Sequence, residues 1–283
     1  MTKLTIKELK EQLALITDPN DPLLETFKLD TRKGAQAALK QWYKNQEKIQ
    51  LVIDQFHEKN IFEIDCLNAG YRYIAGIDEV GRGPLAGPVV SAAVILHPDK
   101  PIYGLDDSKK LSLAKRLQLF DEINEKAIAV GIGVISPAEI DRINILQATK
   151  KAMNLAVSEL PVAPDFLLVD AVKLDNPVPQ EIIIKGDLRS NSIAAASIIA
   201  KVTRDNMMMT YDKEYPGYGF LSNSGYGTGY LKGYKLVTLM SDEDRDDILK
   251  YNIGPDQMED LENIKVFLDV NKFEPLEIKD KDE

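Results

Sequence analysis

The stretch Tyr73–Leu96 constrains the fold most strongly, because two apolar runs flank a turn rich in glycine. This pattern predicts two strands joined by the turn. Two adjacent acids, Asp78 and Glu79, interrupt the first run. Burying both carboxylates is costly unless a cation lies between them and other acidic groups, and Mg²⁺ and Mn²⁺ prefer such oxygen ligands. Alternatively, both acids are solvated at a turn where the strand ends.

The glycine turn has little side-chain cover. Gly81 and Gly83 let the main chain approach a ligand closely, and Arg82 adds a fork of donors that suits phosphate. A dinucleotide-binding loop has similar glycine spacing, but it needs a helix directly after the loop. The strand-like residues that follow, Pro88–Leu96, therefore disfavour a nicotinamide-dependent oxidoreductase, which stays open as a minor alternative.

Composition excludes several kinds of protein. The single cysteine, Cys66, excludes an intrachain disulfide framework and a multi-cysteine zinc site. Only two histidines are present, so a Ser-His-Asp or Cys-His catalytic mechanism is disfavoured. No apolar run is long enough to span a bilayer, so we expect a cytoplasmic protein without a membrane partner. Residues 241–283 hold 15 acids and 6 basic residues, so most of the net charge of −10 lies there.

Apolar spacing predicts an N-terminal helical extension over residues 1–69, to which we assign no chemistry. A third strand over 127–135 would follow the two strands around the glycine turn, so that the sheet begins antiparallel. The expected helices cover residues 1–17, 31–59, 113–126 (with Ser112 as N-cap) and 137–160.

Two further acids end apolar segments. Asp170 ends a continuous apolar run that is typical of a buried strand, and ligands of open α/β sheets gather at the carboxyl ends of strands. The alternative is that Asp170 caps the following turn. A shorter predicted strand, 181–187, ends in Asp187. A helix of small residues follows over 190–205, where Asp205 beside Arg204 is interpreted as a surface pair.

Several segments resemble bacterial ribonuclease HII. The sequence from Ile77 to Pro88, Ile-Asp-Glu-Val-Gly-Arg-Gly-Pro-Leu-Ala-Gly-Pro, is similar to the signature of that family, and the sister type III enzymes typically lack its Gly-Arg-Gly. Further similar segments are Asp-Ser-Lys-Lys-Leu (107–111), Lys-Gly-Asp (185–187), Ala-Ala-Ser-Ile-Ile-Ala-Lys-Val-Thr-Arg-Asp (195–205) and Gly-Tyr-Gly-Thr (225–228). The clear resemblance runs from about Tyr73 to Thr228.

The resemblance implies an α/β, ribonuclease H-like fold with a mixed central sheet flanked by helices. It implies an endonuclease that cleaves RNA in RNA–DNA hybrids and single ribonucleotides within duplex DNA, leaving 5′-phosphate and 3′-hydroxyl ends. The carboxylates of Asp78, Glu79, Asp170 and Asp187 would then be catalytic and would hold two Mg²⁺ or Mn²⁺ ions roughly 4 Å apart.

The same resemblance assigns substrate contacts. The backbone of Gly81, Arg82 and Gly83 would read the 2′-hydroxyl, which distinguishes RNA from DNA. Tyr226 would pack against the neighbouring deoxyribose, although a segment rich in aromatic residues and glycine is also compatible with ordinary loop packing. Lys109 would reach backbone phosphates, or it would form a solvated pair with its neighbour.

The resemblance weakens near the C-terminus. Ser224 stands where the family usually has lysine, and Gly229–Lys232 replaces Lys-Glu-His-Leu. We therefore predict a catalytic domain over 70–235 and a divergent segment over 236–283, a helical and acidic tail. We expect a monomer, and an inactive nucleic-acid-binding relative is the main alternative to an enzyme.

Overall fold

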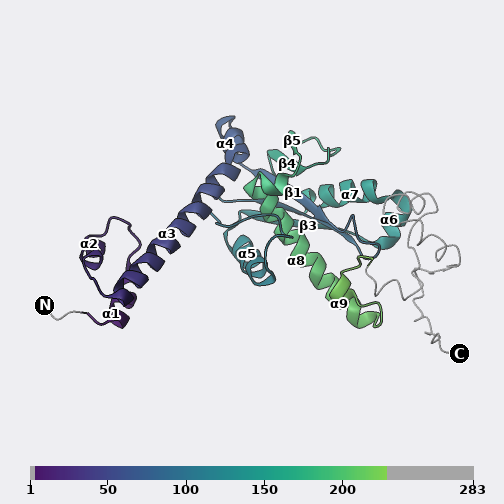
Figure 1. Cartoon of the computed structure of the whole chain (residues 1–283). Coiled ribbons are helices and arrows are strands. Elements are labelled where there is room, and N and C mark those ends of the chain that lie inside the picture. The colour runs from purple at the N-terminus through teal and green to yellow at the C-terminus, as the bar shows by residue number, and fades with distance from the viewer. Residues whose placement is uncertain (1–3, 228–283) are drawn as a thin grey trace, which may run out of the picture. The chain divides into compact units, whose positions relative to one another are not determined.

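A computed structural model describes residues 4–227 (Figure 1). Its contacts divide the chain after Glu58 into two compact units. The predicted tail, 236–283, lies outside the described residues, so the three predicted domains remain a prediction. None of the helices in the described part has the length and apolar character needed to cross a membrane.

The first unit has a small apolar core of its own. Helices α1 (Ile6–Leu15) and α2 (Pro22–Lys28) pack with the start of α3 (Lys33–Lys59). Thr5 caps α1 and forms a reciprocal capping box with Glu8. Helix α2 was not expected from the sequence, although the proline at its start fits the first turn of a helix. The core consists of Leu9, Leu13, Ile16, Leu24, Phe27, Ala35, Ala38, Leu39 and Trp42.

The second unit is built on a mixed sheet with the strand order β3-β2-β1-β4-β5. The strands are β1 (Ile74–Val80), β2 (Val89–Ile95), β3 (Ala129–Ile135), β4 (Phe166–Asp170) and β5 (Gln180–Ile183). Neighbours β1, β2 and β3 pair antiparallel, whereas β4 pairs parallel with both β1 and β5. The predicted mixed α/β sheet that begins antiparallel is confirmed.

Helices cover both faces of this sheet (Figure 1). Alternate residues of β2 point to opposite faces. Ala92 and Val94 contact the layer formed by α8 (Asn191–Glu214) and α5 (Leu113–Lys126), whereas Ala93 and Ile95 belong to the core that α7 (Ile145–Ser158) covers. The remaining helices are α4 (Ile61–Asn68), α6 (Pro137–Ile143) and α9 (Phe220–Asn223).

Glycine lets α8 lie very close to β1. A Cβ atom on Gly76 would be 2.1 Å from the carbonyl carbon of Ser192, so no side chain fits between this strand and the helix. The carboxylate of Glu63 in α4 accepts hydrogen bonds from the Ser192 amide and from the hydroxyls of Ser190 and Ser192 at the N-terminus of α8. These contacts fix the start of α8 beside the central strand.

The structure corrects two predicted elements and, besides α2, adds further helices that were not predicted. The helix predicted over 137–160 is two helices, because Asn144 has a φ of 67° and caps α7. The strand predicted over 181–187 stops at Ile183, and Asp187 lies in the 3₁₀ helix η1 (Gly186–Leu188). Helix α4 was not expected. The helix over 113–126 with its Ser112 cap is confirmed.

Candidate active site

Two parallel strands bring the predicted acids to the same end of the sheet. Ile77 of β1 is paired with Val169 of β4, and Asp78 and Asp170 follow them in their strands. A parallel pair has both carboxyl ends at one edge, where ligands of α/β sheets gather. The apolar runs that predicted these strands therefore also place the two aspartates next to each other.

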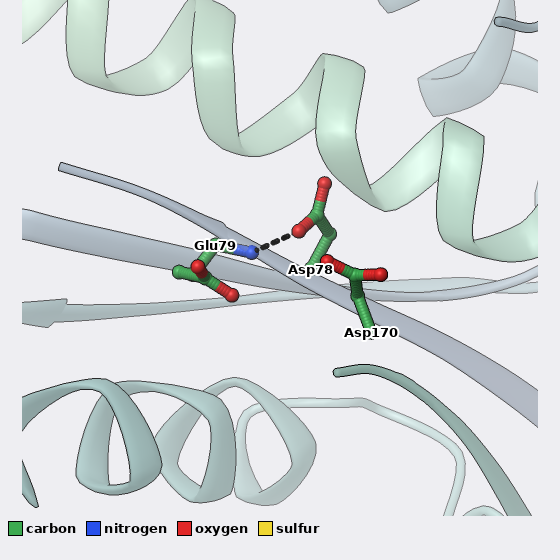
Figure 2. A group of neighbouring side chains, drawn as sticks. All are labelled: Asp78, Glu79 and Asp170. Atoms are coloured by element: carbon green, nitrogen blue, oxygen red, sulfur yellow. Dashed lines mark hydrogen bonds between the residues drawn. The ribbon is translucent and has the colours of Figure 1, made fainter. Parts of the chain in front are cut away.

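Asp78, Glu79 and Asp170 form one group of carboxylates (Figure 2). One oxygen from each lies within 4.8 Å of the others. The backbone amide of Glu79 donates a hydrogen bond to Asp78 Oδ1 over 2.7 Å, and the amide of Gly186 donates to Asp170 Oδ1 over 2.7 Å. Three of the four predicted catalytic residues are thus brought together.

Burial makes the ionised form of this group costly. It raises the pKa of Asp78 well above its usual range, and repulsion from Glu79 raises it further. Burial also raises the pKa values of Glu79 and Asp170, although the positive charge of Arg82 partly opposes both shifts. Without a cation, the folded protein therefore carries an electrostatic penalty at this edge of the sheet.

The donor set fits a hard divalent cation. Oε2 of Glu79 is buried and has no hydrogen-bond partner among the described residues, whereas Arg82 Nη1 donates to the other oxygen, Oε1. Carboxylate oxygens are the ligands that Mg²⁺ and Mn²⁺ prefer. The cluster of acids and the unpartnered oxygen together indicate a metal site. The alternative, in which both acids are solvated at a turn, does not fit, because Asp78 and Oε2 of Glu79 are buried.

Two serines that were not predicted lie near Asp78. Burial raises the pKa of Asp78, and hydrogen bonding by the Ser197 side chain, from α8, partly opposes that rise. Ser197 Oγ in turn lies 3.1 Å from Ser108 Oγ. Both serines are buried. The sequence offered one signal, because Ser197 stands among small residues that let a helix lie close to a sheet.

Asp187 lies at the border of the group. It is half-buried in η1, next to Gly186, whose amide binds Asp170. Burial raises the pKa of Asp187, and the charges of Asp107 and Asp170 raise it further. The three-carboxylate group does not include Asp187, so the structure does not bring all four predicted acids together.

Two cations face the carboxylates. Arg82 Nη1 lies 3.4 Å from Glu79 Oε1, and the charge of Lys109 lowers the pKa values of Glu79, Asp170 and Asp187. Lys109 and its neighbour Lys110 are both exposed, so the phosphate contact and the solvated pair both stay predictions.

Glycines shape the turn beside the acids. Gly81 has a φ of 106°, and a Cβ there would lie 2.4 Å from the carbonyl oxygen of Pro88. A Cβ on Gly83 would lie 3.5 Å from Cε1 of Tyr226, whose side chain is partly exposed. A strand, β2, follows this turn, so the helix that a dinucleotide-binding loop needs is missing at that place.

One interpretation of the sequence was wrong. Arg204 does not form a surface pair with Asp205: its side chain is fully buried and donates to three backbone carbonyls. Asp205 instead pairs with Lys201 and Arg116. A local signal existed, because Arg204 follows Ser197 by seven residues and therefore shares its buried helix face.

The fold and the carboxylates define the class of protein. A mixed sheet with helices on both faces and clustered acids at the carboxyl ends of its central parallel strands is the architecture of a metal-dependent nuclease of the ribonuclease H-like class.

Comparisons with known proteins identify the family. A family profile described as Ribonuclease HII matches residues 75–251, and one described as Ribonuclease HII N-terminal domain matches residues 5–67. Ribonuclease HII of Enterococcus faecalis (strain ATCC 700802 / V583) is 54% identical over 228 residues, which cover 81% of this chain and 89% of that protein. Ribonuclease HII of Bacillus cereus (strain Q1) is 53% identical over 228 residues, with the same coverage of both chains.

A solved structure supports the same assignment. The ribonuclease H2 from Pyrococcus horikoshii OT3 has a TM-score of 0.50 and 25% sequence identity, and the match covers 65% of this chain and 90% of that chain. The chain belongs to the ribonuclease HII family. It is therefore a metal-dependent endoribonuclease that cleaves the RNA of RNA–DNA hybrids. The family match reaches residue 251, beyond Thr228, where the recognisable motifs end.

Proposed function

We propose that the protein cleaves the RNA strand of hybrids and also single ribonucleotides within duplex DNA, leaving 5′-phosphate and 3′-hydroxyl ends. Asp78, Glu79 and Asp170 would hold two Mg²⁺ or Mn²⁺ ions, with Asp187 contributing from the border of the group. The observation that carries this proposal is the approach of three carboxylates from two strands to within 4.8 Å of one another.

The chain's own groups fix the acids for this task. Bound ions would supply Lewis acidity that activates a water and offsets charge on the leaving oxygen. The Glu79 amide holds the Asp78 carboxylate, and the Gly186 amide holds Asp170. Because the first amide lies in the central strand β1 and the second in η1, both within regular structure, the carboxylates are preorganised.

Two loops would contact the substrate. The backbone from Gly81 to Gly83, whose last two residues are exposed, would read the 2′-hydroxyl. The partly exposed ring of Tyr226 would pack against the neighbouring deoxyribose. Arg82 and Lys109 would contact backbone phosphates, since both are cations beside the carboxylates. We also propose that the protein acts as a cytoplasmic monomer.

A cleavage assay tests the function. The full chain is incubated with a labelled DNA duplex that contains one ribonucleotide, with an RNA–DNA hybrid and with a matched all-DNA duplex, in Mg²⁺, Mn²⁺ or chelator. We expect metal-dependent cleavage of the first two duplexes only, with nicks that a polymerase extends and a ligase seals. Binding of the duplexes without cleavage in either metal would instead support the inactive nucleic-acid-binding relative.

A further inference from the structure

A buried guanidinium in α8 joins two loops at the candidate site. The side chain of Arg204 has an exposed fraction of 0%. Its Nε donates to the carbonyl of Pro88 over 2.9 Å, and its Nη2 donates to the carbonyl of Ala86 over 2.9 Å. Its Nη1 donates to the carbonyl of Ser224 over 2.8 Å. One side chain thus binds both the glycine turn and the loop before Tyr226.

The two loops also contact each other directly. The amides of Leu85 and Ala86 both donate to the carbonyl of Gly225, over 2.8 Å and 3.2 Å. Gly225 has a φ of 84°, and a Cβ there would lie 2.1 Å from the carbonyl oxygen of Ala86. Only glycine fits this approach, so the backbones of the two loops lie against each other beside Arg204.

Each loop carries one group that would read the substrate. Gly83 belongs to the glycine turn, and Tyr226 directly follows Gly225. A Cβ on Gly83 would lie 3.5 Å from Cε1 of Tyr226, so the ring lies against the turn. Any change in how the loops are joined therefore changes the position of the ring relative to the turn.

The chemistry of the contact indicates a geometric role. The hydrogen bonds that Arg204 makes among the described residues go to backbone carbonyls, and it forms no ion pair there. A buried cation without a carboxylate partner costs free energy. A rigid planar fork can bind three carbonyls at fixed angles, whereas the single ammonium of lysine cannot reproduce that pattern.

We propose that Arg204 is a positioning residue that fixes the spacing between the Gly81–Gly83 backbone and the ring of Tyr226. The two loops then read a ribonucleotide and the adjacent deoxyribonucleotide as one unit, which sets the preference for an isolated ribonucleotide over continuous RNA. This inference rests on the proposed function, because it uses the substrate contacts assigned there.

The test compares kcat/KM for two substrates: a duplex with one ribonucleotide in DNA and a duplex with a continuous RNA strand. The ring of Tyr226 meets a deoxyribose only in the first. For Arg204→Lys, we expect the ratio of the two kcat/KM values to fall by roughly 10- to 100-fold, because a small misplacement of a substrate-positioning group has an effect of that size.

Two further variants keep the result interpretable. In Gly87→Ala, the new Cβ would lie 2.9 Å from Nη2 of Arg204 and 2.6 Å from Sδ of Met208, and the φ of 96° is strained for alanine, so the variant disturbs the junction of the fork and the turn while keeping the charge of Arg204. This variant should lower the same ratio even if Arg204→Lys does not fold. Met153→Ala, in the core on the α7 face, is the control: it destabilises the fold but should leave the ratio unchanged.

A double-mutant cycle separates positioning from stability. If Arg204 acts through Tyr226, then Tyr226→Ala should change the ratio much less in the Arg204→Lys background than in the wild type. The inference would be overturned if the ratio of the two kcat/KM values were unchanged in both Arg204→Lys and Gly87→Ala, or if Arg204→Lys and Tyr226→Ala had independent effects in the cycle. Either result would leave the proposed function intact. Failure of the wild type to cleave either duplex would overturn both.

Discussion

The two ends of strand β4 carry the same residue type in opposite environments. Asp165 precedes the strand, and its two carboxylate oxygens accept hydrogen bonds from the amides of Arg72 and Tyr73, each over 2.8 Å. Asp170 ends the strand with a single backbone donor, from Gly186, and lies beside two further acids. Burial raises the pKa of Asp170.

The difference shows how a structural carboxylate is told from a functional one. Asp165 is supplied with donors and joins the starts of β1 and β4. At the Asp170 end, the fold brings together more negative charge than its own donors offset. This charge destabilises the folded state unless a cation binds. Acid content alone does not mark the site, whereas the balance of acids and donors does.

The largest expected effect is on activity, which substitutions at the Asp170 end of β4 should lower and a substitution at the Asp165 end should not. Asp78→Asn and Asp170→Asn should each lower kcat by about three orders of magnitude or more, since loss of a metal ligand removes several kcal/mol of transition-state stabilisation. Asp165→Asn should retain activity close to the wild type. The measurement is single-turnover cleavage in Mg²⁺, with folding checked by circular dichroism. Similar activities of Asp165→Asn and Asp170→Asn would remove the distinction.

A smaller effect is expected for the hydroxyl that supports Asp78. Ser197→Ala removes the hydroxyl that partly opposes the rise in the pKa of Asp78, and it should cost about 10- to 100-fold in metal affinity or activity, as is usual for groups that orient metal ligands. Ser91→Ala is the matched control, because this buried hydroxyl donates to the backbone carbonyl of Asp78 over 2.7 Å. A titration of activity against Mg²⁺ concentration measures the difference.

The control variant, Ser91→Ala, should affect stability and not the dependence of activity on Mg²⁺. Ser91→Ala should lower stability by about 1 kcal/mol and leave the metal dependence unchanged. If both serine variants shift the Mg²⁺ dependence equally, the carboxylate support has no special role.

The smallest expected effect concerns stability without metal. Since burial raises the pKa of Asp78, the folded state disfavours its ionised form at neutral pH, and Asp78→Asn should stabilise the metal-free protein by about 1 kcal/mol. Asp165→Ala should instead destabilise it by about 1 kcal/mol, because two backbone amides lose their acceptors. Urea denaturation in chelator measures both.

Adding Mg²⁺ should reverse the order of stability. Ligand binding to the folded state stabilises the wild type but not Asp78→Asn. Destabilisation by Asp78→Asn in chelator would show that the carboxylate is a structural group like Asp165.

The sequence predicted those features that have local causes. Acids within or at the end of apolar runs made Asp78, Glu79 and Asp170 candidates, because an apolar run predicts a buried strand and a carboxylate there needs a partner; the resemblance to the family then assigned their roles. The Ser112 cap was also predictable from local sequence, since a cap acts within one turn of its helix. The order of strand and turn was enough to predict an antiparallel start of the sheet.

Features that depend on distant contacts were missed or misplaced. Arg204 binds carbonyls that lie far away in sequence, so its neighbour Asp205 was a misleading guide to its role. Asp187 lies in a 3₁₀ turn whose position follows from the packing of β4 and α8. The break at Asn144 depends on one residue with positive φ, which hydrophobic spacing does not reveal.

The central claim is that the carboxyl ends of β1 and β4 form a metal site. Its most direct test is anomalous diffraction from a crystal of the full chain soaked in Mn²⁺. We predict anomalous peaks beside Asp78, Glu79 and Asp170 and none beside Asp165. An ordered site without a peak at the three carboxylates, at a Mn²⁺ concentration that supports cleavage, would contradict the account.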